Sequence, residues 1–152
     1  MISELKPAVF SKVTCELGEG PLWHPKRQSL FWLDILNKLL YEKHFDSQQT
    51  DYDHCWPLPW LSSALAVDSE REDMLWLITE HSFGQFDLNT GQYTAKLKLP
   101  LADSFRSNDG GVAPNGDFWF GSMEKHPTAP MGTVYSITPQ GQLHEQLQGT
   151  NL

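Results

Sequence analysis

A run of polar side chains beside two glycines is the part of this sequence best suited to hold a small molecule. It lies within Phe105–Met123, where Arg106, Asn108 and Asp109 precede a Gly-Gly pair at 110–111. A guanidinium fork and a carboxamide suit the hydroxyls and the carbonyl of a small polar ligand. Glycines ease the backbone around such a ligand. The pattern predicts a binding site, with the alternative that Arg106 pairs with Asp109 and Asn108 caps a turn.

A second candidate is Glu19, which stands between Gly18 and Gly20. A carboxylate flanked by glycines is easily aimed at a hard cation, and such cations prefer oxygen ligands. The competing interpretation is an exposed glutamate in a turn. The histidines do not share the spacing of an HExxH motif, so a zinc site built from histidines is not indicated.

Strands and turns are the elements that must position these groups. Asn115-Gly116 separates Val112 from the aromatic run 118–120, and Asn-Gly supplies the two positive-φ positions of a tight hairpin turn. Pro114 ends the first of the two strands. Six Trp and eight Phe, with 11 Gly and 10 Pro, favour strands and turns over helices. We therefore expect an all-β fold.

The same pattern of strands occurs three times along the chain. Trp32 and Trp76 are 44 positions apart, and each copy holds a short apolar strand, a polar turn, an aromatic strand and two further strands. Four strands in roughly 40 to 45 residues is the length of a β-propeller blade. The alternative is an antiparallel sandwich with accidental periodicity.

This periodicity predicts about three four-stranded blades of a β-propeller at approximately 16–58, 60–101 and 106–149. The segment 8–14 alternates like a strand, and we expect it to complete a last blade that this chain does not contain. The tryptophans that repeat along the chain are expected in the blade cores: Trp23, Trp32, Trp76 and Trp119. Three blades leave an arc with two open edges that something must cover.

Composition excludes several classes of partner. The formal net charge of -8 and the pI near 5.1 argue against nucleic acid and anionic membranes, and favour a neutral or cationic ligand. Cys15 and Cys55 lack CxxC spacing, so neither a disulfide framework nor a zinc ribbon is indicated. There is no uninterrupted apolar segment at the N-terminus and no apolar run of 18 residues. We expect a cytoplasmic protein.

Three motifs, in this order, resemble the SMP-30/gluconolactonase/regucalcin family over nearly all of the chain. They are Gly18-Glu-Gly-Pro21 followed by Trp23, Phe31-Trp-Leu-Asp-Ile35, and Arg106-Ser-Asn-Asp-Gly110 leading to 114–123. The resemblance implies a six-bladed propeller of roughly twice this length, with one divalent metal at the mouth of the central tunnel, that hydrolyses sugar lactones. This chain is similar to the N-terminal half of such a protein.

The resemblance also implies roles for particular residues. Glu19 matches a metal ligand, with Ca²⁺ favoured and Zn²⁺, Mn²⁺ or Mg²⁺ left open. Arg106 and Asn108 match residues that contact the sugar, while Asp109 is assigned to structure. The other two metal ligands are an Asn and an Asp that we expect beyond Leu152. Because that Asp is the favoured general base, the catalytic residue is not identified in this chain.

This sequence departs from the family pattern after the methionine of the third blade. Many relatives have a Glu shortly after this residue, Met123. Here Glu124 comes too early and His126 stands at the nearest matching position. Both Glu124 and His126 are candidates to contact the substrate.

Three hypotheses follow. The first is a metal-dependent sugar lactonase whose cation polarises the lactone carbonyl. The second is a propeller that binds calcium or a small molecule without turnover. The third is a half-propeller that completes itself with a second copy or with a separate C-terminal half, which would cover the open blade edges.

Overall fold

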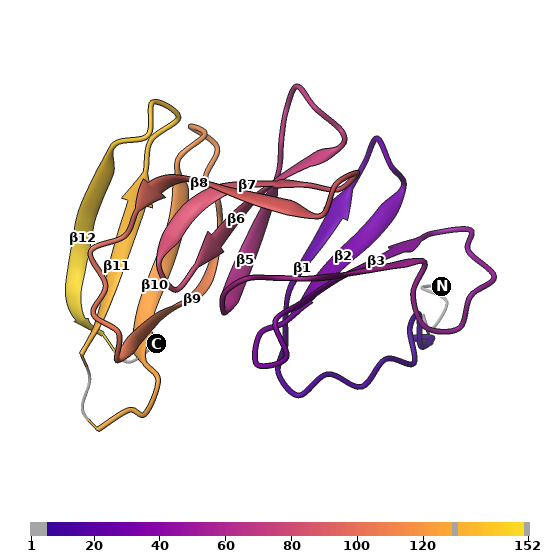
Figure 1. Cartoon of the computed structure of the whole chain (residues 1–152), viewed down its shortest axis with the longest axis horizontal. Helices are drawn as coiled ribbons and strands as arrows, with labels where there is room; N and C mark the ends of the chain where they lie inside the picture. The colour runs from indigo at the N-terminus through magenta and orange to yellow at the C-terminus, as the bar shows by residue number, and fades with distance from the viewer. Residues whose placement is uncertain (1–5, 129–130, 151–152) are drawn as a thin grey trace, which may run out of the picture.

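The protein is built from strands in the two ranges that the computed structural model describes, 6–128 and 131–150. Twelve strands form three antiparallel sheets of four strands each (Figure 1). The first sheet contains β1 (Gly18–His24), β2 (Ser29–Asp34), β3 (Leu39–His44) and β4 (His54–Pro57). The second contains β5 (Ser62–Val67), β6 (Met74–Thr79), β7 (Ser82–Asp87) and β8 (Gln92–Lys98). The third contains β9 (Phe105–Val112), β10 (Phe118–Glu124), β11 (Gly132–Ile137) and β12 (Leu143–Thr150).

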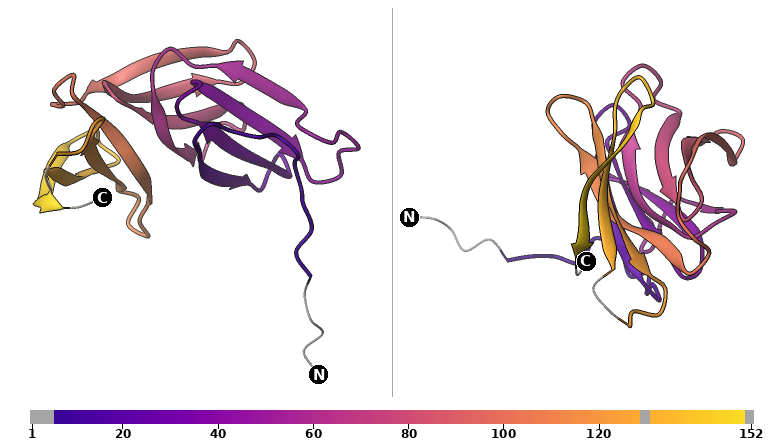
Figure 2. Two further views of the ribbon diagram at one scale, coloured as in Figure 1. Left: turned by 90° about the horizontal axis from the view of Figure 1, so that it is seen from below. Right: turned by 90° about the vertical axis from the view of Figure 1, so that its left-hand side faces the viewer.

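Each sheet is a meander of four consecutive strands, and we call the three sheets blades 1, 2 and 3 in chain order. Figure 2 shows them as successive segments of an arc. The innermost strands β1, β5 and β9 contact one another, and the other strands of each blade follow outward. The arrangement confirms an all-β fold and a partial β-propeller. No helix of the described part is long and apolar enough to cross a membrane.

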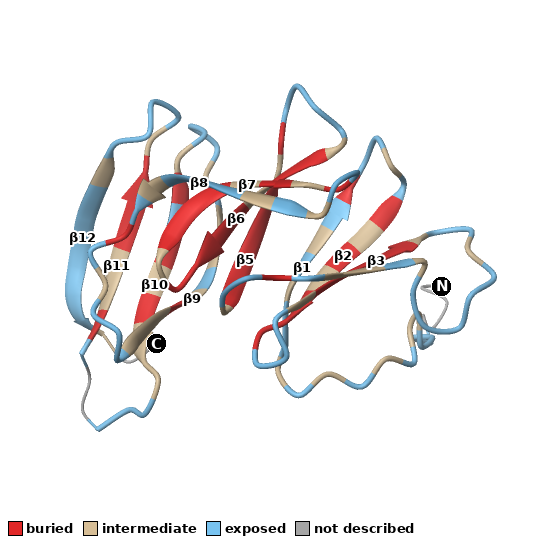
Figure 3. Ribbon diagram, in the orientation of Figure 1, coloured by how far each residue is buried: buried red, intermediate tan, exposed pale blue. Residues whose placement is uncertain are grey.

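Two apolar cores lie between the blades, and Figure 3 shows buried residues along strands of all three blades. The two cores share β6, because successive side chains of a strand point to opposite faces. Leu75 and Leu77 face blade 1, whereas Ile78 and the partly buried Trp76 face blade 3. The first core is formed by Phe31, Leu33, Ile35, Leu40, Leu58, Leu65, Leu75, Leu77, Phe86 and Leu88. The second is formed by Ala64, Ala66, Ile78, Phe83, Leu99, Phe118, Phe120, Tyr135 and Ile137.

The tryptophans do not form a repeated core, so that expectation was wrong. Trp23 and Trp119 are 43% and 38% exposed. Trp32 lies between Phe31 and Leu33, which face blade 2, and therefore points to the opposite side of its sheet. Trp76 alone of the four packs against a core. Trp23, Trp32 and Trp119 lie on the two outer faces of the arc, which none of the three described blades covers.

The hairpin predicted at Asn115-Gly116 is present, with a wider turn than expected. It joins the end of β9 at Val112 to the start of β10 at Phe118. Gly116 has a positive φ of 89°, but Asn115 does not share this conformation. Asn115 instead acts through its side chain, whose Oδ1 accepts a bond from the Asp117 N–H at 3.2 Å.

The segment 8–14 is not part of a strand in this structure, which does not contain the blade that the segment is expected to complete. It lies along the loop between β3 and β4, where the Lys12 N–H donates to the Thr50 carbonyl at 3.1 Å and Ser11 Oγ donates to the Asp51 carbonyl at 2.6 Å. Its role in completing a last blade stays a prediction.

Two glycines let the inner strands come close together. A Cβ at Gly20 would lie 3.1 Å from the Ser63 carbonyl oxygen, and this residue has a positive φ of 62°. A Cβ at Gly110 would lie 2.6 Å from the Trp119 carbonyl oxygen and 3.3 Å from the Ala64 side chain. The absence of a side chain at these two glycines lets β1 and β9 each pack closely against β5.

Candidate functional site

Arg106 and Asn108 form one hydrogen-bonded unit near the start of β9. Arg106 Nη1 donates to the Ser107 carbonyl at 2.9 Å and to Asn108 Oδ1 at 3.2 Å. These bonds hold the Asn108 carboxamide with its oxygen toward the Arg106 guanidinium. The NH₂ group of Asn108 is therefore the part of this side chain that is available to bind a ligand. Among the described residues Arg106 makes no ion pair with Asp109. The alternative of an Arg106–Asp109 pair is therefore not what the structure contains.

Asp109 is the bulge residue of β9. Asn108 pairs with Gly121 and Gly110 pairs with Phe120, which leaves Asp109 without an opposite residue in the ladder. Its φ of 34° is positive, and its Oδ1 accepts a bond from the Gly110 N–H at 2.7 Å. A bulge re-aims the side chains beside it, which here include Asn108.

A buried pair of hydroxyl groups holds β9 against β5. Ser63 Oγ donates to Ser107 Oγ at 2.7 Å, and each serine is 1% exposed. Because Ser107 lies between Arg106 and Asn108, this bond positions the polar unit relative to blade 2. Sequence analysis missed both serines, although Ser62-Ser63 at the start of an otherwise apolar strand was a visible signal.

Glu19 lies at the start of β1, opposite Leu33 in the ladder. Its side chain is exposed and makes no hydrogen bond or ion pair with any residue in the described ranges. The pairing of β1 with β2 shifts between Glu19 and Leu22, so Glu19 precedes a bulge as Asn108 does. Gly20, which follows it, is the residue that packs against β5.

Glu19 and Arg106 lie on β1 and β9, two inner strands that contact each other. Burial lowers the pKa of the Arg106 guanidinium below its ordinary value, while the carboxylates of Glu19 and Glu80 act in the opposite direction. Glu80 comes from blade 2 and Glu19 from blade 1. Side chains of all three blades therefore share one electrostatic environment around Arg106.

Glu80 forms an ion pair that joins blades 2 and 3. Its Oε2 lies 2.5 Å from the Lys125 ammonium, and its Oε1 accepts a bond from the Leu61 N–H at 3.1 Å. Burial by itself raises the pKa of Glu80, but the bonds from Lys125 and Leu61 lower it overall. Sequence analysis did not single out this pair. A carboxylate directly after the buried strand β6 was the signal that could have found it.

The two remaining candidates, Glu124 and His126, lie at the end of β10 and in the loop that follows. Glu124 Oε2 accepts bonds from the Thr128 N–H at 2.9 Å and from Thr128 Oγ1 at 3.2 Å. Glu124 therefore caps the loop 125–128 in this structure. His126 is exposed. A contact of either with the substrate stays a prediction.

The described residues contain no group of three or more His, Cys, Asp or Glu side chains placed to hold a metal ion. Glu19 offers a hard oxygen ligand, but one carboxylate does not make a metal site. Two cavities are bounded by described residues elsewhere, one of about 440 Å³ on blade 1 and one of about 550 Å³ beside Trp60 and β8. Neither is lined by Glu19, Arg106 or Asn108.

Comparison with known proteins places this arrangement in context. Residues 17–152 match the family described as the SMP-30/gluconolactonase/LRE-like region. An L-arabinolactonase from Azospirillum brasilense is 27% identical over 123 residues, which are 80% of this chain and 40% of that protein. A protein from Rhizobium meliloti, named as a candidate sugar lactone lactonase, is 28% identical over 84% of this chain and 42% of its own length.

Solved structures of known proteins also resemble this chain. The calcium-binding protein regucalcin from Agrobacterium tumefaciens superposes with a TM-score of 0.84 at 27% identity, covering 93% of this chain and 46% of that one. A gluconolactonase from Xanthomonas campestris, at 18% identity and a TM-score of 0.65, shares the fold. The chain spans less than half the length of each of these relatives.

Proposed function

Because this chain belongs to the SMP-30/gluconolactonase/LRE-like family, we propose that the protein hydrolyses sugar lactones and that Arg106 and Asn108 orient the substrate. Relatives named as lactonases support this activity at the level of the family. The observation that carries the proposal for this chain is the hydrogen-bonded Arg106–Asn108 unit near the start of β9.

The chemistry of the unit fits a lactone. A guanidinium presents only donors, and Asn108 turns its NH₂ donors outward because its oxygen accepts from Arg106. A lactone offers acceptors in its carbonyl and ring oxygens, and its hydrolysis product is a carboxylate. Donors fixed before binding stabilise the negative charge that develops on the carbonyl oxygen during attack by water.

Glu19 is assigned a different part in this proposal. We expect its exposed carboxylate to be one ligand of a divalent cation, with Ca²⁺ favoured and Zn²⁺, Mn²⁺ or Mg²⁺ as alternatives. When bound, such a cation would polarise the lactone carbonyl and activate water. Since the described residues supply a single carboxylate for it, the remaining ligands and the general base must come from outside them.

Acid release from D-glucono-1,5-lactone and L-arabino-1,4-lactone tests the proposal, in a protein that also supplies the remaining ligands and the general base, with each divalent metal and with a chelator. We expect metal-dependent turnover that Arg106→Met lowers by roughly 100-fold, as loss of an oriented donor does. Arg71→Met is the matched control, because Arg71 is an exposed arginine on the β5–β6 turn. Turnover that ignores the chelator, or an Arg106→Met variant as active as Arg71→Met, would contradict the proposal.

A second candidate is cation binding without turnover. It is favoured by the similarity to a structure named as a calcium-binding protein and by the exposed carboxylate of Glu19. Calorimetry with CaCl₂ on the original chain and on Glu19→Gln distinguishes the two. Binding that Glu19→Gln abolishes, in a chain that turns over neither lactone, would support this second function.

A further inference from the structure

The cavity of about 550 Å³ lies on blade 2, whose two faces pack on blades 1 and 3 through the two apolar cores. Its lining comes from the loop between β4 and β5, from the β6–β7 turn, and from β8 with the residues that follow it. β8 is the outermost strand of blade 2 (Figure 1). A cavity of this size is large enough for a small molecule. Arg106 and Asn108 do not line it, so it is a separate candidate for a binding site.

One wall of the cavity is aromatic. Trp60 is 44% exposed, and its ring meets the ring of His81 at 86° with the centroids 4.6 Å apart. An exposed indole offers a rigid, flat apolar surface together with a polar N–H group. The C–H groups on the face of a sugar ring pack on such a surface, while the sugar hydroxyls bond to polar groups around it. This wall therefore suits a sugar.

Backbone hydrogen bonds hold the two rings of this wall in place. The Leu61 N–H donates to Glu80 Oε1 at 3.1 Å, and the Glu80 N–H donates to the Leu61 carbonyl at 2.8 Å. Trp60 precedes Leu61 and His81 follows Glu80, so this reciprocal pair of bonds fixes the backbone beside both rings. The His81 carbonyl also accepts a bond from the Leu99 N–H at 2.9 Å, which ties the turn to the end of β8. A wall that is formed before binding costs little to order.

The opposite part of the cavity carries positive charge. Lys96 and Lys98 line it, both are exposed, and neither forms an ion pair with a described residue. Asp103 is the one carboxylate among the lining residues, so the lining has an excess of positive charge in a chain of formal net charge -8. Ammonium groups bind carboxylates and phosphates, and Asp103 can accept bonds from hydroxyls. The two exposed lysines also oppose the addition of a further strand to the edge at β8.

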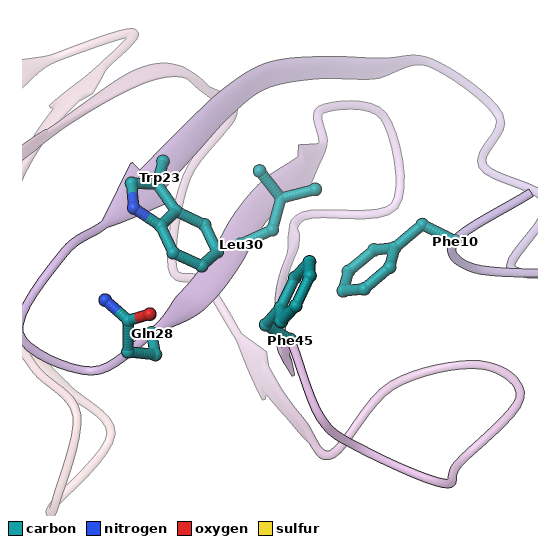
Figure 4. A pocket seen from close by; sticks show the side chains of 5 residues that line it. All are labelled: Phe10, Trp23, Gln28, Leu30 and Phe45. Atoms are coloured by element: carbon teal, nitrogen blue, oxygen red, sulfur yellow. The ribbon is translucent and has the colours of Figure 1, made fainter. Parts of the chain in front are cut away.

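This charged lining distinguishes the cavity from the one on blade 1. The cavity on blade 1 is formed by Phe10, Trp23, Gln28, Leu30 and Phe45 (Figure 4). Gln28 is its one polar lining residue, and none of the five is charged. That cavity therefore indicates no particular ligand, whereas the lining of the cavity on blade 2 combines an aromatic wall with two ammonium groups.

We propose that the cavity beside Trp60 binds an anionic sugar, whose ring packs on the indole and whose carboxylate or phosphate group meets Lys96 and Lys98. Sugar acids and sugar phosphates share this chemistry, and the experiment below distinguishes them. The site does not depend on the proposed hydrolysis of lactones, because it shares no residue with the Arg106–Asn108 unit.

Nuclear magnetic resonance of the ¹⁵N-labelled chain tests the proposal, in titrations with D-gluconate, D-glucose-6-phosphate and neutral D-glucose. The indole N–H signal of Trp60 is identified by its loss in Trp60→Phe. We expect this signal to shift with at least one of the two anions, and the anion that binds more tightly identifies the preferred group. Neutral D-glucose should bind at least roughly fivefold more weakly, because it lacks the charge that the lysines attract. Arg106→Met should leave the shift unchanged, which separates this site from the proposed lactonase site.

Variants of the lining give the second readout. Lys96→Gln combined with Lys98→Gln should weaken binding of the anion roughly fivefold or more and leave D-glucose unaffected. Trp60→Ala should weaken binding of the anion by about tenfold. Lys12→Gln is the matched control, because Lys12 is an exposed lysine that does not line the cavity. Circular dichroism establishes that each variant is folded.

Three results would overturn the proposal. The first is a Trp60 signal that neither anion shifts. The second is D-glucose binding as tightly as the anions. The third is a double lysine variant that binds the anion as well as Lys12→Gln does.

Discussion

The Lys125 ammonium lies 2.5 Å from the Glu80 carboxylate, and the pair connects the ends of β10 and β6 in neighbouring blades. The same end of blade 3 holds the Lys125 N–H bond to the Ser104 carbonyl, at 2.8 Å and two residues before Arg106. Glu80 is 7% exposed, so its charge is stabilised chiefly by Lys125 and by the Leu61 N–H. The ion pair therefore ties the two blades together beside the candidate site.

Removing one partner of this pair should destabilise the fold. Lys125→Met leaves a buried carboxylate without its counter-charge, and we expect the free energy of unfolding at neutral pH to fall by about 1–3 kcal/mol. The pKa of Glu80 is lowered in the folded state, so the stabilisation is present above its ordinary value of 4.5 and is lost as pH falls through the lower folded value. The difference between the two chains should shrink in that acidic range.

Urea unfolding at neutral pH and in steps below pH 4.5 measures both effects. Arg71→Met is the control, because it removes the exposed Arg71–Asp73 ion pair of 2.9 Å. We expect little change from this control, since solvent screens exposed pairs. Equal losses from the two variants, or a Lys125→Met deficit that does not depend on pH, would show that the Glu80–Lys125 pair is not the source.

The two neighbouring glycines of β9 should respond differently to alanine. A Cβ at Gly110 would lie 2.6 Å from the Trp119 carbonyl oxygen, whereas a Cβ at Gly111 meets no atom within 4 Å. Gly110→Ala must push β9 and β10 apart, and we expect a loss of about 1–3 kcal/mol in the free energy of unfolding. Gly111→Ala should be neutral or slightly stabilising, because it restricts the unfolded chain. Urea unfolding measures the free energy of unfolding of both variants. Similar free energies for the two would refute the close contact at Gly110.

The hydrogen bond between Ser63 and Ser107 should appear as coupling in a double-mutant cycle. Ser63→Ala or Ser107→Ala leaves one buried hydroxyl without its partner, and each should cost about 1–2 kcal/mol. The double variant removes both hydroxyls, so its loss should be smaller than the sum by about 1 kcal/mol. Chemical denaturation of the four proteins gives the coupling. Strictly additive losses would mean that the hydroxyls do not depend on each other.

The architecture could be predicted from the sequence because its signals are local and repeated. The Asn115-Gly116 turn and the recurring aromatic strands each follow from a short stretch of chain, and three copies support one another. The face of the sheet to which each side chain points was harder to predict. Trp32 and Trp76 stand at similar places in the pattern, yet they point to opposite sides of their blades, because a shift of one residue reverses the face of a strand.

The candidate site, too, could be predicted from the sequence only in part. Arg106 and Asn108 are close in sequence, so their hydrogen bond could be anticipated. Glu80 pairs with Lys125 across a blade boundary, and the two residues are 45 positions apart in the sequence. No sequence motif marks Glu80. Contacts between blades depend on how the sheets stack, and only the three-dimensional structure supplies this information.

Tyr41 should be the last tyrosine of its region to ionise. It is 7% exposed, its ring stacks on Trp32 with centroids 5.3 Å apart, and burial, followed by the nearby Cys55 thiol, raises its pKa to about 12. A raised pKa means that the folded state keeps the proton longer, so stability is lost as pH rises from about 10 toward 12. We expect Tyr41→Phe to remove on the order of 2 kcal/mol of this alkaline loss. Phenolate absorbance should lose its latest step in Tyr41→Phe but keep it in Tyr52→Phe, which removes the hydroxyl of the exposed neighbouring tyrosine. If Tyr41→Phe keeps that step and the full alkaline loss, another group is responsible for both.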